Sequence, residues 1–226
     1  MPEHMQVEVA PNQSVTAIVY SAAKRDHVNV TLILGHGAGA GQRSDFMTRF
    51  AAELAARGLN VVTFNFLYTE QGRRVPDSNN VLEACFVAVL EAVKHKKIGH
   101  SALVIGGKSL GGRIASQIAA AGAEVGGLIF LGYPLHPPGK QDQLRANHLQ
   151  KINVPMLFVQ GSRDAFGMPD ELRPIFKELK APIDLYVMEG GDHSFKVLKR
   201  AGVTQEDAYK ATLDRIEAWL RQTFPN

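Results

Sequence analysis

Short apolar segments that alternate with helix-like segments along the chain constrain its fold more than any other feature. Residues 30–34 read VTLIL, and residues 127–131 and 156–160 are similarly apolar. Continuous apolar runs of this length are typical of strands that are buried on both faces of a parallel sheet. The helical patterns between them are long enough for the crossovers that parallel pairing requires. The sequence therefore predicts an α/β protein with a twisted, mostly parallel sheet of about eight strands and helices on both faces.

The expected elements cover most of the chain and leave no linker or repeat between them. Strands are expected at residues 6–10, 15–20, 30–34, 60–66, 102–106, 127–131, 156–160 and 183–188, and helices at 44–57, 78–97, 110–121, near 169–179 and from 204 toward 224. Thr204 and Asp207 have the spacing of a capping box at the start of the last helix. A length of 226 residues fits one large domain, so residues 1–226 are interpreted as a single unit.

Composition excludes several classes of protein. The chain has 25 Lys+Arg and 22 Asp+Glu, and a formal net charge of +3 is too small to indicate nucleic acid or an anionic membrane as a partner. No segment approaches the roughly 18 consecutive apolar residues of a membrane span. The N-terminal residues lack the apolar run of a signal peptide, and the single cysteine, Cys85, precludes an intrachain disulfide. A cytoplasmic location is therefore expected.

A nucleophile motif follows the strand expected at residues 102–106. Gly107, Ser109 and Gly111 form the pattern G-x-S-x-G between that strand and a helix. A serine at such a tight turn projects its hydroxyl above the sheet, and glycine neighbours allow the helix and strand to approach closely. The helix N-terminus beside it favours developing negative charge. The alternative interpretation is an ordinary glycine-rich turn capped by a serine.

An acid and a histidine follow two later strands, in the order that the motif requires. Asp164 lies in GSRD after the strand at 156–160, and His193 lies in GGDHS after the strand at 183–188. In open α/β sheets the residues beyond the carboxyl ends of the strands meet at one edge, so both can lie beside Ser109. His193 would then act as general base and Asp164 would orient it. Asp192 is the rival acid, although side chains of adjacent residues in an extended loop point apart.

The oxyanion of acyl transfer needs two hydrogen-bond donors. The backbone N–H of Leu110, directly after the nucleophile, is the first candidate. The second is the N–H of Ala38 in the HGAG segment after the strand at 30–34. His36 in the same segment is expected to shape the loop through its own hydrogen bonds.

These segments together resemble a known superfamily. HGAGAG, GGKSLGG, YPLHPPG, FVQGSRD and GGDHSF are similar to the α/β-hydrolases, specifically to the small lidless branch that contains dienelactone-hydrolase-like and testis-expressed, KANL-type hydrolase-like proteins. The resemblance covers residues 6–224 and implies a serine hydrolase fold in which Ser109, Asp164 and His193 match the family's triad. In dienelactone hydrolases proper the nucleophile is cysteine, so the resemblance does not extend to that activity.

The loops around this edge suggest the kind of substrate. Residues 133–154, where many α/β-hydrolases insert a lid, are only 22 residues long and rich in proline. An open site of this kind favours small or short-chain esters or thioesters. Arg73 and Arg74 lie after the strand at 60–66 and could bind a carboxylate or phosphate of the substrate, the alternative being a solvated loop or an ion pair with Glu70 or Asp77. His136 could reach the mouth of the site, or simply pack in its proline-bounded turn.

Other functions fit the sequence less well. Gly107-Lys108-Ser109 resembles the end of a Walker A loop, but that loop requires a glycine where this chain has Ala102. The glycines of HGAGAG fit a loose dinucleotide fingerprint, yet no acidic residue ends the next strand. The eight histidines are scattered, so no metal or other cofactor is predicted. The remaining alternatives are a peptidase and a catalytically silent interaction scaffold on the same fold.

The prediction is a serine hydrolase, a carboxylesterase or thioesterase, that forms an acyl-enzyme at Ser109 without a cofactor. Its partner would be a small-molecule substrate, and the chain would be a monomer or a homodimer.

Overall fold

The elements of a computed structural model, which describes residues 2–23, 27–98, 102–198 and 202–225, follow the predicted alternation. The strands are β1 (Glu3–Ala10), β2 (Gln13–Tyr20), β3 (Val30–Gly35), β4 (Asn60–Phe64), β5 (Ala102–Lys108), β6 (Gly127–Leu131), β7 (Met156–Gly161) and β8 (Ile183–Met188). The helices are α1 (Asp45–Ala56), α2 (Leu67–Glu70), α3 (Asn79–His95), α4 (Leu110–Ala120), α5 (Pro169–Phe176) and α6 (Gln205–Thr223), with a 3-10 helix η1 (Asn147–Lys151).

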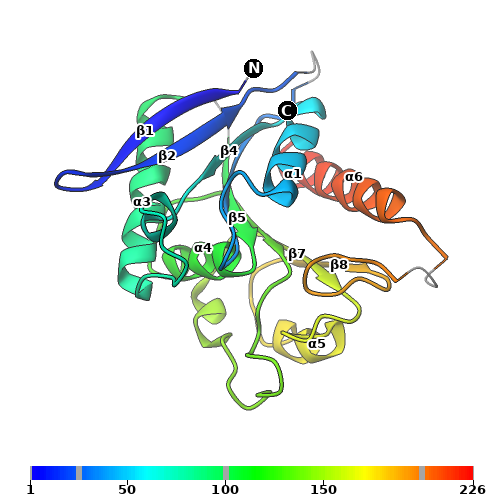
Figure 1. Ribbon diagram of the computed structural model, residues 1–226. Coiled ribbons are helices and arrows are strands. Elements are labelled where there is room, and N and C mark those ends of the chain that lie inside the picture. The colour runs from blue at the N-terminus through cyan, green and yellow to red at the C-terminus, as the bar shows by residue number, and fades with distance from the viewer. Residues whose placement is uncertain (1, 24–26, 99–101, 199–201, 226) are drawn as a thin grey trace.

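The strands form one eight-stranded sheet in the order β1-β2-β4-β3-β5-β6-β7-β8 (Figure 1). β1 pairs antiparallel with β2, and β2 pairs antiparallel with β4. The other five pairings are parallel. The predicted α/β-hydrolase architecture is therefore confirmed. Since β3 and β5 to β8 all run in one direction, the loops that follow them gather at a single edge of the sheet.

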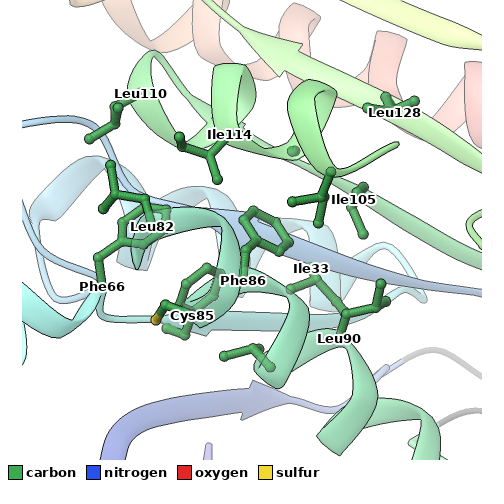
Figure 2. Close-up of a cluster of buried hydrophobic side chains, with 14 of the residues drawn as sticks. Ile33, Phe66, Leu82, Cys85, Phe86, Leu90, Ile105, Leu110, Ile114 and Leu128 are labelled. Carbon is green, nitrogen blue, oxygen red and sulfur yellow. The ribbon is translucent and has the colours of Figure 1, made fainter. Parts of the chain in front are cut away.

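Two hydrophobic cores cover the two faces of the sheet. Along β3, Ile33 points into one core, whereas Leu32 and Leu34 point into the other, which explains why the strand has no polar face. Figure 2 shows part of the first core, where α3 and α4 pack on the sheet through side chains such as Phe86 and Ile114. Cys85 lies in this core, as predicted, and burial raises the pKa of its thiol to about 12.

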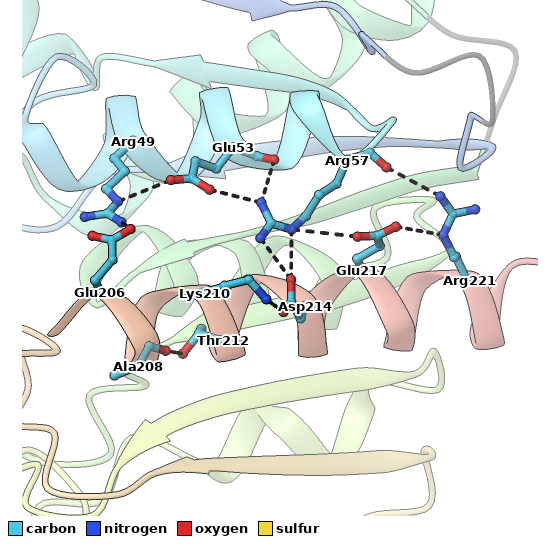
Figure 3. Close-up of polar contacts among 10 residues, drawn as sticks. All are labelled: Arg49, Glu53, Arg57, Glu206, Ala208, Lys210, Thr212, Asp214, Glu217 and Arg221. Carbon is cyan, nitrogen blue, oxygen red and sulfur yellow. Dashed lines mark hydrogen bonds and ion pairs between the residues drawn. The ribbon is translucent and has the colours of Figure 1, made fainter. Parts of the chain in front are cut away.

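The other face is covered by α1 and α6, which are joined by a chain of ion pairs (Figure 3). Arg57 of α1 is the centre of this chain. Its guanidinium lies 3.0 Å from Glu53 Oε2 and 2.9 Å from Asp214 Oδ1 of α6. Glu217 of α6 lies 3.7 Å from the same guanidinium, and Arg49 pairs with Glu206. These contacts fix the two helices relative to each other in addition to their apolar packing.

Some boundaries differ from the sequence-based expectation. The strand predicted at 60–66 ends at Phe64, because the N–H of Phe66 donates to the His36 ring instead of to a neighbouring strand. The chain then forms the short helix α2, which is not among the helices expected from the sequence. The helix predicted near 169–179 ends at Phe176. At the start of α6, Thr204 Oγ1 accepts the Asp207 N–H at 3.0 Å, which confirms the predicted cap.

The connection between β6 and β7, all of whose residues are described, contains only η1. The predicted absence of a lid is therefore confirmed for this segment. No helix in the described part of the chain is both long enough and apolar enough to cross a membrane.

Candidate active site

Ser109 occupies a sharp turn between β5 and α4. Its backbone has φ 49° and ψ −109°, a conformation that costs a non-glycine residue free energy. The turn also requires glycine around it. A Cβ on Gly107, which has φ 153°, would lie 2.2 Å from the Gly35 carbonyl oxygen, and a Cβ on Gly111 would lie 2.1 Å from the same atom. These glycines therefore let β5 and α4 touch the end of β3.

The structure brings the three predicted side chains of the triad together in one hydrogen-bonded chain. His193 Nε2 lies 2.8 Å from Ser109 Oγ. On the other side of the ring, His193 Nδ1 lies 2.9 Å from Asp164 Oδ1 and 2.8 Å from Oδ2. Asp164 follows β7 and is fully buried, whereas His193 follows β8 and is partly exposed. This geometry leaves the Nε2 side of the imidazole available for proton exchange with the serine.

The rival acid Asp192 has a different role. Its Oδ1 accepts the backbone N–H of Ser194 at 2.8 Å and of Lys196 at 3.0 Å. These two bonds close the turn that carries His193. The His193 ring contacts Asp164 and not Asp192, so the sequence-based preference for Asp164 agrees with the geometry.

Two residues that support the triad have no signal of their own in the sequence. Gln160, at the end of β7, donates from Nε2 to Asp164 Oδ2 at 2.9 Å and to the Gly167 carbonyl at 2.7 Å. Its Oε1 accepts the N–H of Tyr133 at 2.9 Å, so this buried amide ties the ends of β6 and β7 together. Phe166 stacks on the His193 ring with a centroid distance of 4.0 Å and an interplanar angle of 26°.

The segment predicted to supply an oxyanion donor lies directly beside the nucleophile. A methyl group on Gly37 would lie 3.7 Å from Ser109 Cβ. Within the described residues, the N–H groups of Ala38 and Leu110 make no backbone hydrogen bond. Leu110 is the first residue of α4, so its N–H is one of the helix N-terminal donors that lack an intrahelical partner. Both donors are therefore available for a ligand.

His36 fixes the conformation of this segment, as expected. Its Nε2 accepts the N–H of Phe66 at 3.1 Å, so the proton must reside on Nδ1, which lies 2.9 Å from the Gly37 carbonyl oxygen. The ring is fully buried, and burial lowers its pKa to about 4. The neutral imidazole thus links the oxyanion segment after β3 to the chain that leaves β4.

In the described part of the chain, none of the three residues predicted to bind substrate makes a hydrogen bond or ion pair with Ser109, Asp164 or His193. The Arg73 guanidinium pairs with Asp77 Oδ1 at 2.6 Å, which is the ion pair weighed as the alternative from the sequence. Arg74 is exposed on the same loop. His136 is buried; its Nε2 lies 3.2 Å from Glu171 Oε1 and its Nδ1 lies 2.9 Å from the Pro137 carbonyl oxygen. This ring packs within its turn instead of reaching the mouth of the site.

The cavities of the protein lie at several distinct places. A cavity of about 760 Å³ lies between α1 and β2 near Tyr20 and Ala52, and none of the three triad residues lines it. A smaller cavity of about 350 Å³ lies behind Asp164 and is lined by His136 and Glu171. Among the described residues, no group of three or more His, Cys, Asp or Glu side chains is arranged to hold a metal ion.

Comparisons with known proteins agree with this architecture. Residues 28–221 match the model of a family described as an alpha/beta hydrolase domain. An alpha-beta serine hydrolase homologue from Coxiella burnetii is 20% identical with a TM-score of 0.71, and the match covers 97% of this chain and 96% of that one. A dienelactone hydrolase from Anabaena variabilis is 17% identical with a TM-score of 0.76, over 98% of this chain and 97% of that one.

A protein from Xanthomonas campestris, described as a member of the α/β serine hydrolases without lid, is 20% identical with a TM-score of 0.70. That match covers 100% of this chain and 96% of that one. The family match spans most of the sequence, and the solved structures share its fold over nearly their whole length. The chain therefore belongs to the alpha/beta hydrolase family, in its small form without a lid.

Proposed function

We propose that this protein is a serine hydrolase that cleaves small or short-chain carboxylic esters or thioesters through an acyl-enzyme at Ser109. The observation that carries the proposal is the continuous hydrogen-bonded chain from Ser109 Oγ through His193 to Asp164. A strained serine hydrogen-bonded to a histidine, with two backbone donors nearby, is the set of groups that acyl transfer requires.

In the proposed mechanism, Ser109 Oγ attacks the carbonyl carbon of the substrate while His193 Nε2 accepts the hydroxyl proton. Asp164 holds the ring by its Nδ1–H and stabilises the imidazolium that forms. The N–H groups of Leu110 and Ala38 bind the developing oxyanion. His193 then donates its proton to the departing alcohol or thiol, and the same steps with water release the acid.

The substrate class follows from the loops. The β6–β7 connection contains no helix other than the short η1, which supports an open site in which a long acyl chain would remain in contact with water. Short acyl groups lose little from such exposure. Gln160 and Phe166 hold Asp164 and His193 in place, which supports precise orientation of the base without closure of a lid.

The test is labelling with a fluorophosphonate probe, in which the wild type is compared with Ser109→Ala and His193→Ala. We expect the wild type alone to be labelled, and a panel of p-nitrophenyl esters to show turnover that falls as the acyl chain lengthens. The matching thioester and amide of the best acyl group then rank the leaving groups. A folded wild type that is neither labelled nor active would contradict the proposal and favour an interaction scaffold.

A further inference from the structure

Lys108, the residue before the nucleophile, reaches beneath the triad. Its stem passes the oxyanion segment, where a methyl group on Gly37 would lie 3.6 Å from Lys108 Cγ. Its Nζ donates to the main-chain carbonyl oxygen of His193 at 2.5 Å. The ammonium also lies 5.1 Å from the centroid of the Phe195 ring and 6.0 Å from that of Phe46. One side chain therefore connects the nucleophile turn with the loop that carries the base.

The charge of Lys108 is costly in this place. The charged groups that face the ammonium are Asp164, after β7, and Asp192, in the loop after β8, and both raise its pKa. Burial outweighs them and lowers the pKa to about 8. Neither carboxylate, nor any other in the described part of the chain, lies within ion-pair distance of Nζ. Burial therefore disfavours the protonated side chain in the folded protein. A hydrophobic residue of similar length would carry no such cost.

The loop held by Lys108 needs an anchor. Phe195, two residues after the histidine, has φ 61°, a left-handed conformation that is unfavourable for an aromatic residue. The same loop is pinned by the side chain of Asp192 and by the isolated bridge between Gly191 and Val197. The His193 carbonyl lies between these contacts. The bond from Lys108 fixes the main chain at the residue whose ring must meet both Ser109 and Asp164.

We infer that Lys108 is a positioning residue, whose ammonium holds the His193 main chain so that the imidazole stays aligned between Ser109 and Asp164. The inference rests on the proposed function, since it assigns a task only if His193 acts as the base. A positioning role and a purely structural role predict different effects on stability when the lysine is removed. A lysine kept for stability should destabilise the protein when removed, whereas a positioning lysine that is buried at a cost should not.

The test compares Lys108→Met and Lys108→Arg with Lys196→Met, a matched control that removes an exposed lysine from the His193 loop. For each variant we would measure the rate of fluorophosphonate labelling, kcat for a short-chain ester from pH 6 to 9.5, and Tm. For Lys108→Met we expect kcat and labelling to fall by about 100-fold, because a misplaced base costs this much, while Tm at pH 7 stays equal or rises. The control should match the wild type.

The pH profile separates positioning from packing. In the wild type, activity should decline as the pH rises through about 8, where Lys108 loses its charge and its bond to His193 weakens. Lys108→Arg keeps a charge at every pH in this range, so it should recover activity relative to Lys108→Met and show no decline near pH 8.

Three results would overturn the inference. They are unchanged labelling of Lys108→Met, a loss of Tm or of folding in that variant that parallels its loss of activity, and the same alkaline decline in Lys108→Arg as in the wild type. If the wild type is labelled at Ser109 and Lys108→Met is labelled equally fast, only this inference fails. If the folded wild type is not labelled at all, the proposed function fails with it.

Discussion

Replacing Gly111 by alanine should damage both the stability and the activity of the protein. The new Cβ would lie 2.1 Å from the carbonyl oxygen and 2.3 Å from the carbonyl carbon of Gly35. An ordinary contact begins at 3.4 Å, and moving from 2.1 Å to 3.4 Å requires a separation of 1.3 Å between α4 and the end of β3. Neither partner is a flexible side chain, so the backbone itself must shift.

The magnitude follows from this displacement. Overpacking costs about 1–3 kcal/mol where side chains can adjust, so we expect about 3 kcal/mol or more for a clash between two backbones. For a protein of this size that corresponds to a fall in Tm of roughly 6–12 °C. Gly35 begins the segment that carries Ala38, so this proposed oxyanion donor moves as well. A shift of about 1 Å typically lowers kcat about 100-fold.

The assay is thermal unfolding followed by circular dichroism, together with the rate of fluorophosphonate labelling. Gly37→Ala is the matched control, because its Cβ would meet its nearest neighbour, the Lys108 carbonyl oxygen, at 3.5 Å, an ordinary contact. The control should keep the Tm of the wild type. The reasoning would be refuted if Gly111→Ala melted within about 2 °C of the wild type and were labelled at the same rate.

Three further outcomes are expected. Asp164→Asn should keep its fold but lose about 10³–10⁴-fold in kcat, because an amide cannot stabilise the imidazolium of His193; a loss below tenfold would contradict that role. His36 has a pKa of about 4 in the folded protein and an ordinary value near 6.5. As the pH falls, the unfolded chain therefore takes up a proton at this residue first, and the free energy of unfolding should fall by up to about 3 kcal/mol between pH 6.5 and pH 4. Urea unfolding of His36→Asn should show a smaller loss of stability than the wild type over this pH range. If stability fell equally with pH in both proteins, His36 would not be the group responsible. Arg73→Ala should leave the ratio of kcat/KM for anionic and neutral esters unchanged, because Arg73 is already paired with Asp77; a fall in that ratio would restore the substrate role predicted from the sequence.

The sequence predicted the fold and the positions of the triad for related reasons. A strand buried on both faces must be apolar throughout. VTLIL and the similar apolar segments therefore indicate both where the strands lie and that their two faces are covered. Parallel strands bring their following residues to one edge, so Ser109, Asp164 and His193 could be expected to meet without knowledge of any loop conformation. These predictions depended only on the direction and order of the strands.

The contacts that the sequence did not predict depend on loop conformations. The apolar pattern NVVTFNF continues through Phe66, yet β4 ends earlier, because His36 from another loop binds the Phe66 N–H. Gln160 gave no sign that its amide would bind Asp164, because its partners lie in two separate segments, the loop after β7 and the chain after β6. Similarly, His136 is held by Glu171, 35 residues away. Long-range pairing of this kind leaves no periodic pattern in the chain.

The connection between β6 and β7 has a consequence for how this protein could acquire new specificities. Its exposed residues 138–144 are closed at their base, where the Arg145 N–H donates to the Leu135 carbonyl at 2.8 Å and the Tyr133 hydroxyl donates to the Arg145 carbonyl at 2.7 Å. Because closing a longer loop costs only about 0.6 kcal/mol for each doubling of its length, extra residues can be inserted here at little expense in stability. The hydrogen bonds at Arg145 would hold the base of the loop in place while such an insertion lengthened its exposed part. The fold therefore separates a loop that tolerates insertions from the strand ends that carry the triad.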